Sequence, residues 1–157
     1  DESHVNDRTR YRRYGRSLRG VRPRFRYAFV RGVRYPVSVA VNYRGISDYV
    51  IIGGSCTSHL FFEWFITSLY SSLPHDGILI LDNARMHHYQ PFIELAGFLR
   101  IGLIYLPAYC PFLNPVEHIF AALKAAIKRY RMEMIISPVE TLAFILERLR
   151  GFNVRGC

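Results

Sequence analysis

The stretch ILILDNARMHHYQ, residues 78–90, decides the fold. Its apolar run, Ile78 to Leu81, ends abruptly on Asp82 and Asn83, and two histidines follow. A short apolar run bounded by turn-forming residues is typical of a buried β-strand. A strand that leads directly into a carboxylate either stops on a polar residue or presents a ligand at the edge of a sheet, and both interpretations stand at this point.

The segments on either side carry strand and helix periodicities in turn. YPVSVAVNYRG (35–45) places Val at every second position, and with SDYVIIGGS (47–55) it predicts a hairpin over 35–53. IGLIYLP (101–107) reads as another strand, covered on both faces. Helices are expected in SHLFFEWFITSLYSSL (58–73), YQPFIELAGFLR (89–100), PVEHIFAALKAAIKRYR (115–131) and SPVETLAFILERLR (137–150), with Thr57 or Ser58 and then Ser137 as N-caps. This order predicts an α/β domain with helices on a mixed sheet.

The segment LPAYCPFLNPVEHIF, residues 106–120, contains a second acid in a structured setting. Asn114 is placed as an N-cap, Pro115 as the first helical residue and Glu117 as the third. Glu117 therefore either completes a capping box with Asn114 or serves as a ligand. Carboxylates at a strand end and in the first turn of a helix can converge at the rim of a sheet, where α/β proteins bind ligands. Paired carboxylates suit Mg²⁺ or Mn²⁺.

Positive charge is concentrated near the start of the chain. The net charge is +9, and between Arg8 and Ser47 there are twelve arginines and no acid. Guanidinium groups bind phosphate in a bidentate fork, so the basic segment 8–34, interleaved with Tyr and Phe, favours nucleic-acid contact. The alternative is a solvated arm that serves solubility.

Length and composition bound the remaining possibilities. The 157 residues suit one domain, 1–157, and half of them are hydrophobic, which argues against global disorder. No apolar run approaches the roughly 18–20 residues of a membrane span, so no membrane partner is expected. Three cysteines without CxxC spacing favour a reducing compartment over disulfides or zinc. The chain lacks an initiator Met, so we expect a fragment of a longer protein.

Three motifs in order resemble the catalytic domain of mariner-type (Tc/mariner superfamily) DDE transposases, within the DDE superfamily of endonucleases. The segment from Asp82 to His87 resembles the second-acid motif of that family, and Leu106 to Glu117 resembles the third-acid motif. The 34 residues between Asp82 and Glu117 match one large branch of the superfamily. The opening Asp1-Glu2-Ser3, followed by Arg12 to Gly20, resembles the first-acid segment. Ala108 and Cys110 depart from the third motif, which usually has Pro and Ser there.

The resemblance implies an RNase H-like fold whose central first strand is largely missing here, because the chain starts at the first acid. It implies that Asp1, Asp82 and Glu117 hold two divalent ions, Mg²⁺ or Mn²⁺, and cleave and transfer DNA strands. It implies as partners DNA at transposon ends and targets, and a possible homodimer, in the nucleus or in a prokaryotic cytoplasm. Supporting roles fall to Asn83, His87 and Asn114, and DNA contact to Arg12, Arg13, Arg16, Arg19, Arg22 and Arg24.

Two other functions stay open from the sequence. One is a catalytically inert nucleic-acid-binding remnant of a mobile element, and the other is an RNase H-like nuclease with a different substrate. For His87 and His88, an ordinary position as partly exposed loop histidines is the alternative to a supporting role. His118 is expected on the helix surface.

Overall fold

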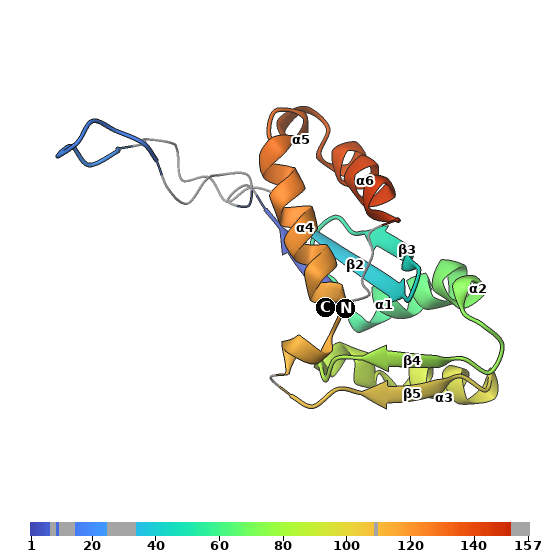
Figure 1. The fold of residues 1–157 in the computed structure, drawn as a ribbon. Coiled ribbons are helices and arrows are strands. Elements are labelled where there is room, and N and C mark those ends of the chain that lie inside the picture. Colours follow the sequence, from blue (N-terminus) through green and yellow to red (C-terminus); the bar gives the residue numbers. More distant parts are fainter. Residues whose placement is uncertain (7–8, 10–14, 25–33, 109, 152–157) are drawn as a thin grey trace.

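The computed structural model describes residues 1–6, 9, 15–24, 34–108 and 110–151. Within these residues the strands form two small sheets, and helices pack against both (Figure 1). Arg12 and Arg13, two of the predicted DNA-binding residues, lie outside the described residues. None of the helices in the described part of the chain is both long and apolar enough to cross a lipid bilayer.

The first sheet contains the predicted hairpin and one further strand. Strands β2 (Tyr35–Asn42) and β3 (Gly45–Ile51) pair antiparallel, with Asn42 opposite Gly45 at the turn. Strand β1 (Glu2–Val5) pairs antiparallel with the other edge of β2. Strand β1 extends over four residues and starts directly after Asp1.

The second sheet consists of two parallel strands joined by a helical crossover. Strands β4 (Ile78–Leu81) and β5 (Gly102–Tyr105) pair with Ile78 opposite Gly102, and α3 (Gln90–Phe98) connects them. Parallel pairing places the carboxyl ends of both strands at the same edge of the sheet. Asp82 therefore lies beside the segment that follows β5.

A long helical segment precedes β4. It comprises α1 (Ser58–Trp64), a π-helical turn (Phe65–Leu69) and α2 (Tyr70–Ser72). Thr57 caps it as predicted, because its hydroxyl oxygen accepts a 3.3 Å hydrogen bond from the backbone N–H of Leu60. The C-terminal helices are α4 (Val116–Arg129), α5 (Glu133–Ile136) and α6 (Pro138–Leu149), and α4 stands beside the three-stranded sheet (Figure 1).

Two hydrophobic cores lie on opposite faces of the β2–β3 hairpin. Val37 and Val39 pack with α4 and α6, around Phe120 and Leu142. The opposite face of the hairpin packs against the second core, which contains Phe61, Trp64, Phe65, Leu69, Leu81, Phe92, Ala96 and Ile101. The alternation of side chains along a strand explains how one hairpin serves both cores.

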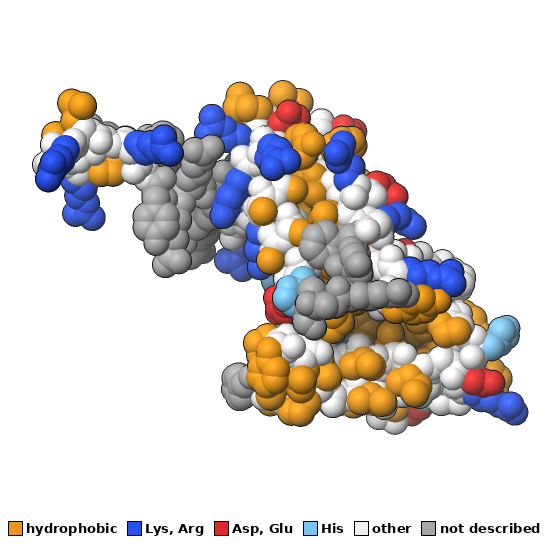
Figure 2. All heavy atoms as spheres, viewed as in Figure 1, with side chains coloured by type: hydrophobic (Ala, Val, Ile, Leu, Met, Phe, Trp, Pro, Cys, Tyr) orange, Lys and Arg blue, Asp and Glu red, His pale blue; other side chains and the backbone are white. Residues whose placement is uncertain are grey.

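The parallel strands are less buried than the sequence predicted. The side chains of Ile78, Ile80 and Ile104 are 63%, 59% and 48% exposed. Figure 2 shows hydrophobic side chains gathered over β4 and β5 on the lower part of the molecule. The predictions that the strand in 101–107 is covered on both faces and that the strand at 78–81 is buried are therefore wrong for the described residues, since a solid apolar run does not reveal which of its faces has a partner.

Candidate active site

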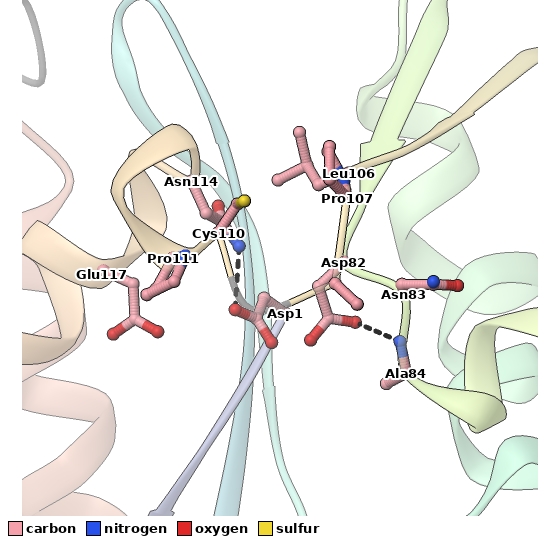
Figure 3. A pocket seen from close by; sticks show the side chains of 11 residues that line it. Asp1, Asp82, Asn83, Ala84, Leu106, Pro107, Cys110, Pro111, Asn114 and Glu117 are labelled. Atoms are coloured by element: carbon pink, nitrogen blue, oxygen red, sulfur yellow. Dashed lines mark hydrogen bonds between the residues drawn. The ribbon is translucent and has the colours of Figure 1, made fainter.

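The three acids singled out in the sequence line one cavity of about 380 Å³. Asp1 precedes β1, Asp82 follows β4, and Glu117 lies in the first turn of α4. The lining is completed by Asn83, Ala84, Leu106, Pro107, Ala108, Cys110, Pro111 and Asn114. Figure 3 shows the carboxylates of Asp1 and Asp82 side by side, with Glu117 projecting from its helix beyond them. Residues up to 116 positions apart in the sequence therefore share one cavity.

The Asp1 carboxylate is held by two hydrogen bonds. Its Oδ1 accepts from the backbone N–H of Glu2 at 2.7 Å, and its Oδ2 accepts from Nδ2 of Asn114 at 2.8 Å. Asn114 is itself fixed, because its Oδ1 accepts from the backbone N–H of Val116 at 3.3 Å. Asn114 thus contacts both the start of α4 and the first acid.

The Asp82 carboxylate is oriented by its own loop. Its Oδ1 accepts a 2.9 Å hydrogen bond from the backbone N–H of Ala84 and lies 2.8 Å from Nδ1 of His87. The Asp82 side chain remains 38% exposed, so oxygen atoms are left free to face the cavity. The polar residue at the end of β4 is therefore a restrained group that faces a cavity, and it does more than terminate a strand.

His87 is fully buried, so the alternative of a partly exposed loop histidine is wrong for this residue. Its ring packs against Phe61 with centroids 4.8 Å apart, and its backbone carbonyl accepts a 3.0 Å hydrogen bond from the Tyr105 hydroxyl. Nε2 lies 3.3 Å from Oε1 of Glu2, on the side of the ring opposite to Asp82. His87 therefore stands between two carboxylates.

His88, unlike the buried His87, lies at the surface. It is exposed and stacks on Tyr105 with ring centroids 4.3 Å apart, and its Nε2 lies 2.7 Å from Oδ1 of Asn83. Asn83, a predicted supporting residue, thus lines the cavity and contacts His88. The neighbouring histidines have different environments despite their adjacency in the sequence. His118 lies on the exposed surface of α4, as expected.

Glu2 is the site residue that sequence reasoning missed. Burial of its carboxyl raises the pKa, the hydrogen bond with His87 and the α-ammonium lower it, and the net pKa lies below its ordinary value of 4.5. The side chain is 8% exposed, and Ser38 donates to Oε1 at 3.5 Å. The position of Glu2, directly after Asp1 and inside a strand, was the signal in the sequence that could have identified it. Its partner His87 lies 85 residues away in the chain, so the sequence alone did not connect the two.

Glu117 does not complete the capping box that was the alternative to a ligand role. The backbone N–H of Asn114, which the box would require, donates to the Pro111 carbonyl at 3.0 Å. The helix also begins at Val116, one residue later than predicted. The Glu117 side chain is exposed and lines the cavity, so it is available for another role.

The donor types in the cavity suit a hard divalent cation, because three carboxylates offer oxygen ligands of the kind that Mg²⁺ and Mn²⁺ prefer. Within the described residues, however, no group of three or more His, Cys, Asp or Glu side chains is arranged to hold a metal ion. The carboxylates therefore fit the chemistry of such a site and surround one cavity without forming a closed set of ligands.

Four of the predicted DNA-binding arginines lie in the described part of the basic segment. Arg16, Arg19, Arg22 and Arg24 belong to the exposed stretch 15–24. This stretch turns at Gly20, which has φ +86°, and the backbone N–H of Val21 donates to the Leu18 carbonyl at 3.0 Å. The structure thus presents these guanidinium groups to solvent.

The chain matches the model of a known protein family. The profile of the DDE superfamily endonuclease family matches residues 1–136. No curated protein sequence matches the chain.

Among solved structures, the chain is similar to the mariner Mos1 paired-end complex with Mg, with a TM-score of 0.73 and 18% identity over 99% of this chain and 49% of that one. It is similar to the Mos1 transposase paired-end complex with the left transposon end, with a TM-score of 0.67 and 18% identity over 96% and 51%. The Mos1 catalytic domain with Raltegravir and Mg gives a TM-score of 0.51 and 19% identity over 78% and 75%. The fold is therefore RNase H-like, and the chain spans about half the length of the transposases in the first complexes.

Proposed function

Because the chain belongs to the DDE superfamily endonuclease family, we propose that it is the catalytic part of a mariner-type transposase that cleaves and joins DNA with the help of Mg²⁺ or Mn²⁺. The observation that carries the proposal is the common cavity of Asp1, Asp82 and Glu117. Mos1 structures contain Mg or Mn and transposon-end DNA, which supports the same class of metal and substrate here.

In the proposed reaction, Asp1, Asp82 and Glu117 would hold two divalent cations through carboxylate oxygens. When bound, the cations neutralise charge on the phosphate and activate the attacking water or DNA 3′-hydroxyl. The chain's own contribution is placement, because in-line displacement at phosphorus depends on positioning and electrostatics more than on covalent catalysis. Asn114 and the Ala84 N–H restrain two of the three carboxylates, which reduces the motion that must be lost when ligands bind.

The proposed substrates are the ends of a transposon and the target DNA into which they are joined. The exposed arginines of the stretch 15–24 support contact with the phosphate backbone. The paired-end complexes of Mos1 support a homodimer as the working assembly. DNA as substrate makes the nucleus the proposed location, or the cytoplasm in a prokaryote.

A second candidate is nucleic-acid binding without catalysis. It is favoured by the finding that the acids of the described residues do not form a closed ligand set. The two candidates differ in one measurable respect, since only the first requires cleavage that depends on a divalent cation. An RNase H-like nuclease with another substrate would cleave RNA–DNA hybrids in preference to duplex DNA.

The experiment is a nicking assay on supercoiled plasmid with Mg²⁺ or Mn²⁺, using the full chain and Asp82→Asn. Nicking should appear with metal and be abolished in Asp82→Asn, while DNA affinity stays within about twofold because the arginines are unchanged. Asp76→Asn is the matched control: Asp76 is exposed in a turn with φ 52°, a conformation that Asn tolerates well. Equal nicking by Asp82→Asn and the unmodified chain would overturn the proposed chemistry. Binding without metal-dependent nicking would favour the second candidate.

A further inference from the structure

A buried imidazole links the two strands that carry the first and second acids. β1 and β4 belong to separate sheets among the described residues. The ring of His87 spans the space between them. Its Nε2 lies 3.3 Å from Oε1 of Glu2, and its Nδ1 lies 2.8 Å from Oδ1 of Asp82 and 3.3 Å from the backbone carbonyl oxygen of Asp82. Glu2 is the immediate neighbour of Asp1 in β1, so the bridge connects the surroundings of both acids.

We propose that His87 and Glu2 are positioning residues, and that the bridge Glu2–His87–Asp82 fixes the orientation of the Asp82 carboxylate and its placement relative to Asp1. This inference rests on the proposed function, in which both aspartates bind divalent cations. Neither Glu2 nor His87 is among the residues that line the cavity, so the two residues act through Asp82 and do not contact the substrate.

The environment of the ring explains how it can hold a carboxylate in one orientation. The His87 side chain is fully buried, packed against Phe61 and tied through its backbone carbonyl to Tyr105. A buried ring packed against Phe61 offers its Nδ1 from a fixed point, whereas the Asp82 side chain is 38% exposed and is otherwise oriented by the backbone N–H of Ala84. A hydrogen bond from outside the ligand set commonly sets the orientation of a metal-binding side chain in this manner.

The burial of the Glu2 carboxylate requires polar partners, and the His87 ring is one of them. The Glu2 side chain is 8% exposed, and a buried carboxylate is stable only when it is hydrogen-bonded or paired. His87 and Ser38 supply these contacts at 3.3 and 3.5 Å.

The bridge itself can be tested in the metal-free chain, independently of any activity. A ring N–H that is buried and bonded to a carboxylate should give a proton NMR resonance downfield of the backbone amides and protected from exchange with solvent. We expect this resonance in the unmodified chain, its loss in His87→Phe, and a shift in both Asp82→Asn and Glu2→Gln. A resonance that does not move in Asp82→Asn and Glu2→Gln would overturn the bridge.

The consequence for metal binding is tested with Mn²⁺ alone, by titration calorimetry on variants whose folding is verified by circular dichroism. His87→Phe keeps an aromatic ring against Phe61 and removes both polar contacts, so Mn²⁺ affinity should fall about tenfold. His59→Phe, the same exchange at an exposed histidine, should leave the affinity unchanged. Unchanged Mn²⁺ affinity in folded His87→Phe would overturn the positioning role.

Glu2→Gln provides a second route if His87→Phe does not fold. It should weaken Mn²⁺ binding in the unmodified background and have little further effect in the His87→Phe background, because the two residues act as one unit. Additive losses in the double variant would show that Glu2 acts through its charge alone and would contradict the bridge. Asp82→Asn distinguishes a failure of the proposed function from a failure of the positioning role. If Asp82→Asn binds Mn²⁺ as tightly as the unmodified chain, the proposed function fails. If Asp82→Asn loses Mn²⁺ affinity and His87→Phe does not, only the positioning role is rejected.

Discussion

The side-chain amide of Asn114 donates a 2.8 Å hydrogen bond to the carboxylate of Asp1, a residue 113 positions earlier in the chain. The same side chain accepts a hydrogen bond from the backbone N–H of Val116 at the start of α4. One residue thus contacts the helix that carries Glu117 and the acid that precedes β1. The relative placement of two proposed ligands therefore depends on Asn114.

Replacing Asn114 separates these two contacts. Asn114→Ala removes both, whereas Asn114→Ser keeps an oxygen near the Val116 N–H and is too short to reach Asp1. Metal-dependent nicking should fall about tenfold in both variants, because each frees the Asp1 carboxylate. Only Asn114→Ala should also lose about 1 kcal/mol of unfolding free energy, measured by urea denaturation. Full nicking by Asn114→Ser would show that the contact with Asp1 is dispensable.

The local elements of this chain follow from short-range sequence signals. The hairpin follows from the alternating valines 37, 39 and 41, and the crossover helix α3 lies within the predicted range 89–100. The helix that begins at Pro138 also starts where predicted, directly after Ser137, although the Ser137 side chain makes no capping hydrogen bond. Each of these signals is contained within one turn or one strand, so no knowledge of the packed structure was needed.

The parts that sequence reasoning missed depend on contacts over long distances in the chain. Glu2 is understood only once His87 is beside it, and the exposure of Ile80 only once the faces of β4 and β5 are known. Glu117 shows a related limit: its position suited a capping box, but the backbone N–H of Asn114 is already used by Pro111. Local patterns identify which residues are polar or apolar, and tertiary packing decides which partner each one meets.

The core that α6 forms with the hairpin should be sensitive to truncation. Leu142 is fully buried among residues of β2, α4 and α6, so Leu142→Ala leaves a cavity and should lower the unfolding free energy by about 2–5 kcal/mol. Val139→Ala, one turn earlier on the same helix and 47% exposed, should cost less than about 1 kcal/mol. Urea unfolding followed by circular dichroism measures both. Equal losses in the two variants would contradict this assignment of the buried face of α6.

The lowered pKa of Glu2 predicts a dependence of stability on pH. Although burial acts to raise this pKa, the hydrogen bond with His87 and nearby positive charge bring it below 4.5 in the folded chain, so folding favours the ionised carboxylate. The resulting stabilisation is complete above pH 4.5 and is lost as the pH falls through the folded pKa. The difference in unfolding free energy between the unmodified chain and Glu2→Gln should therefore shrink below pH 4.5. A difference that stays constant from pH 7 to the acid limb would contradict the shift.

Cys56 should react slowly with alkylating reagents. Burial and the nearby Glu2 carboxylate raise the pKa of its thiol, while the contact with Ser38 acts in the opposite direction. Less thiolate is present at a given pH when the pKa is raised, so iodoacetamide should modify Cys56 more slowly than an unstructured peptide thiol. Glu2→Gln should speed the reaction because it removes one of the raising causes, and Glu133→Gln, at an exposed site on α5, should not. Peptide mass spectrometry over a pH series distinguishes Cys56 from the other cysteines.

The exposed arginines of the stretch 15–24 should determine how DNA affinity depends on salt. Each phosphate contact made by a cation contributes about 0.9 to the slope of log affinity against log salt concentration on duplex DNA. The double variant Arg16→Gln with Arg19→Gln should therefore reduce the slope by up to about 1.8 if both side chains contact phosphate.

The control is Lys124→Gln with Lys128→Gln, which makes the same change in charge on the exposed face of α4. Fluorescence anisotropy at four or more salt concentrations gives the slopes. A smaller slope in the arginine pair alone assigns the phosphate contacts to this turn of the basic segment. If both pairs lower the slope equally, the effect follows net charge and the turn has no special contact with DNA. An unchanged slope in the arginine pair would leave these residues a role in solubility only, since guanidinium groups that release no counterions do not touch the phosphate backbone.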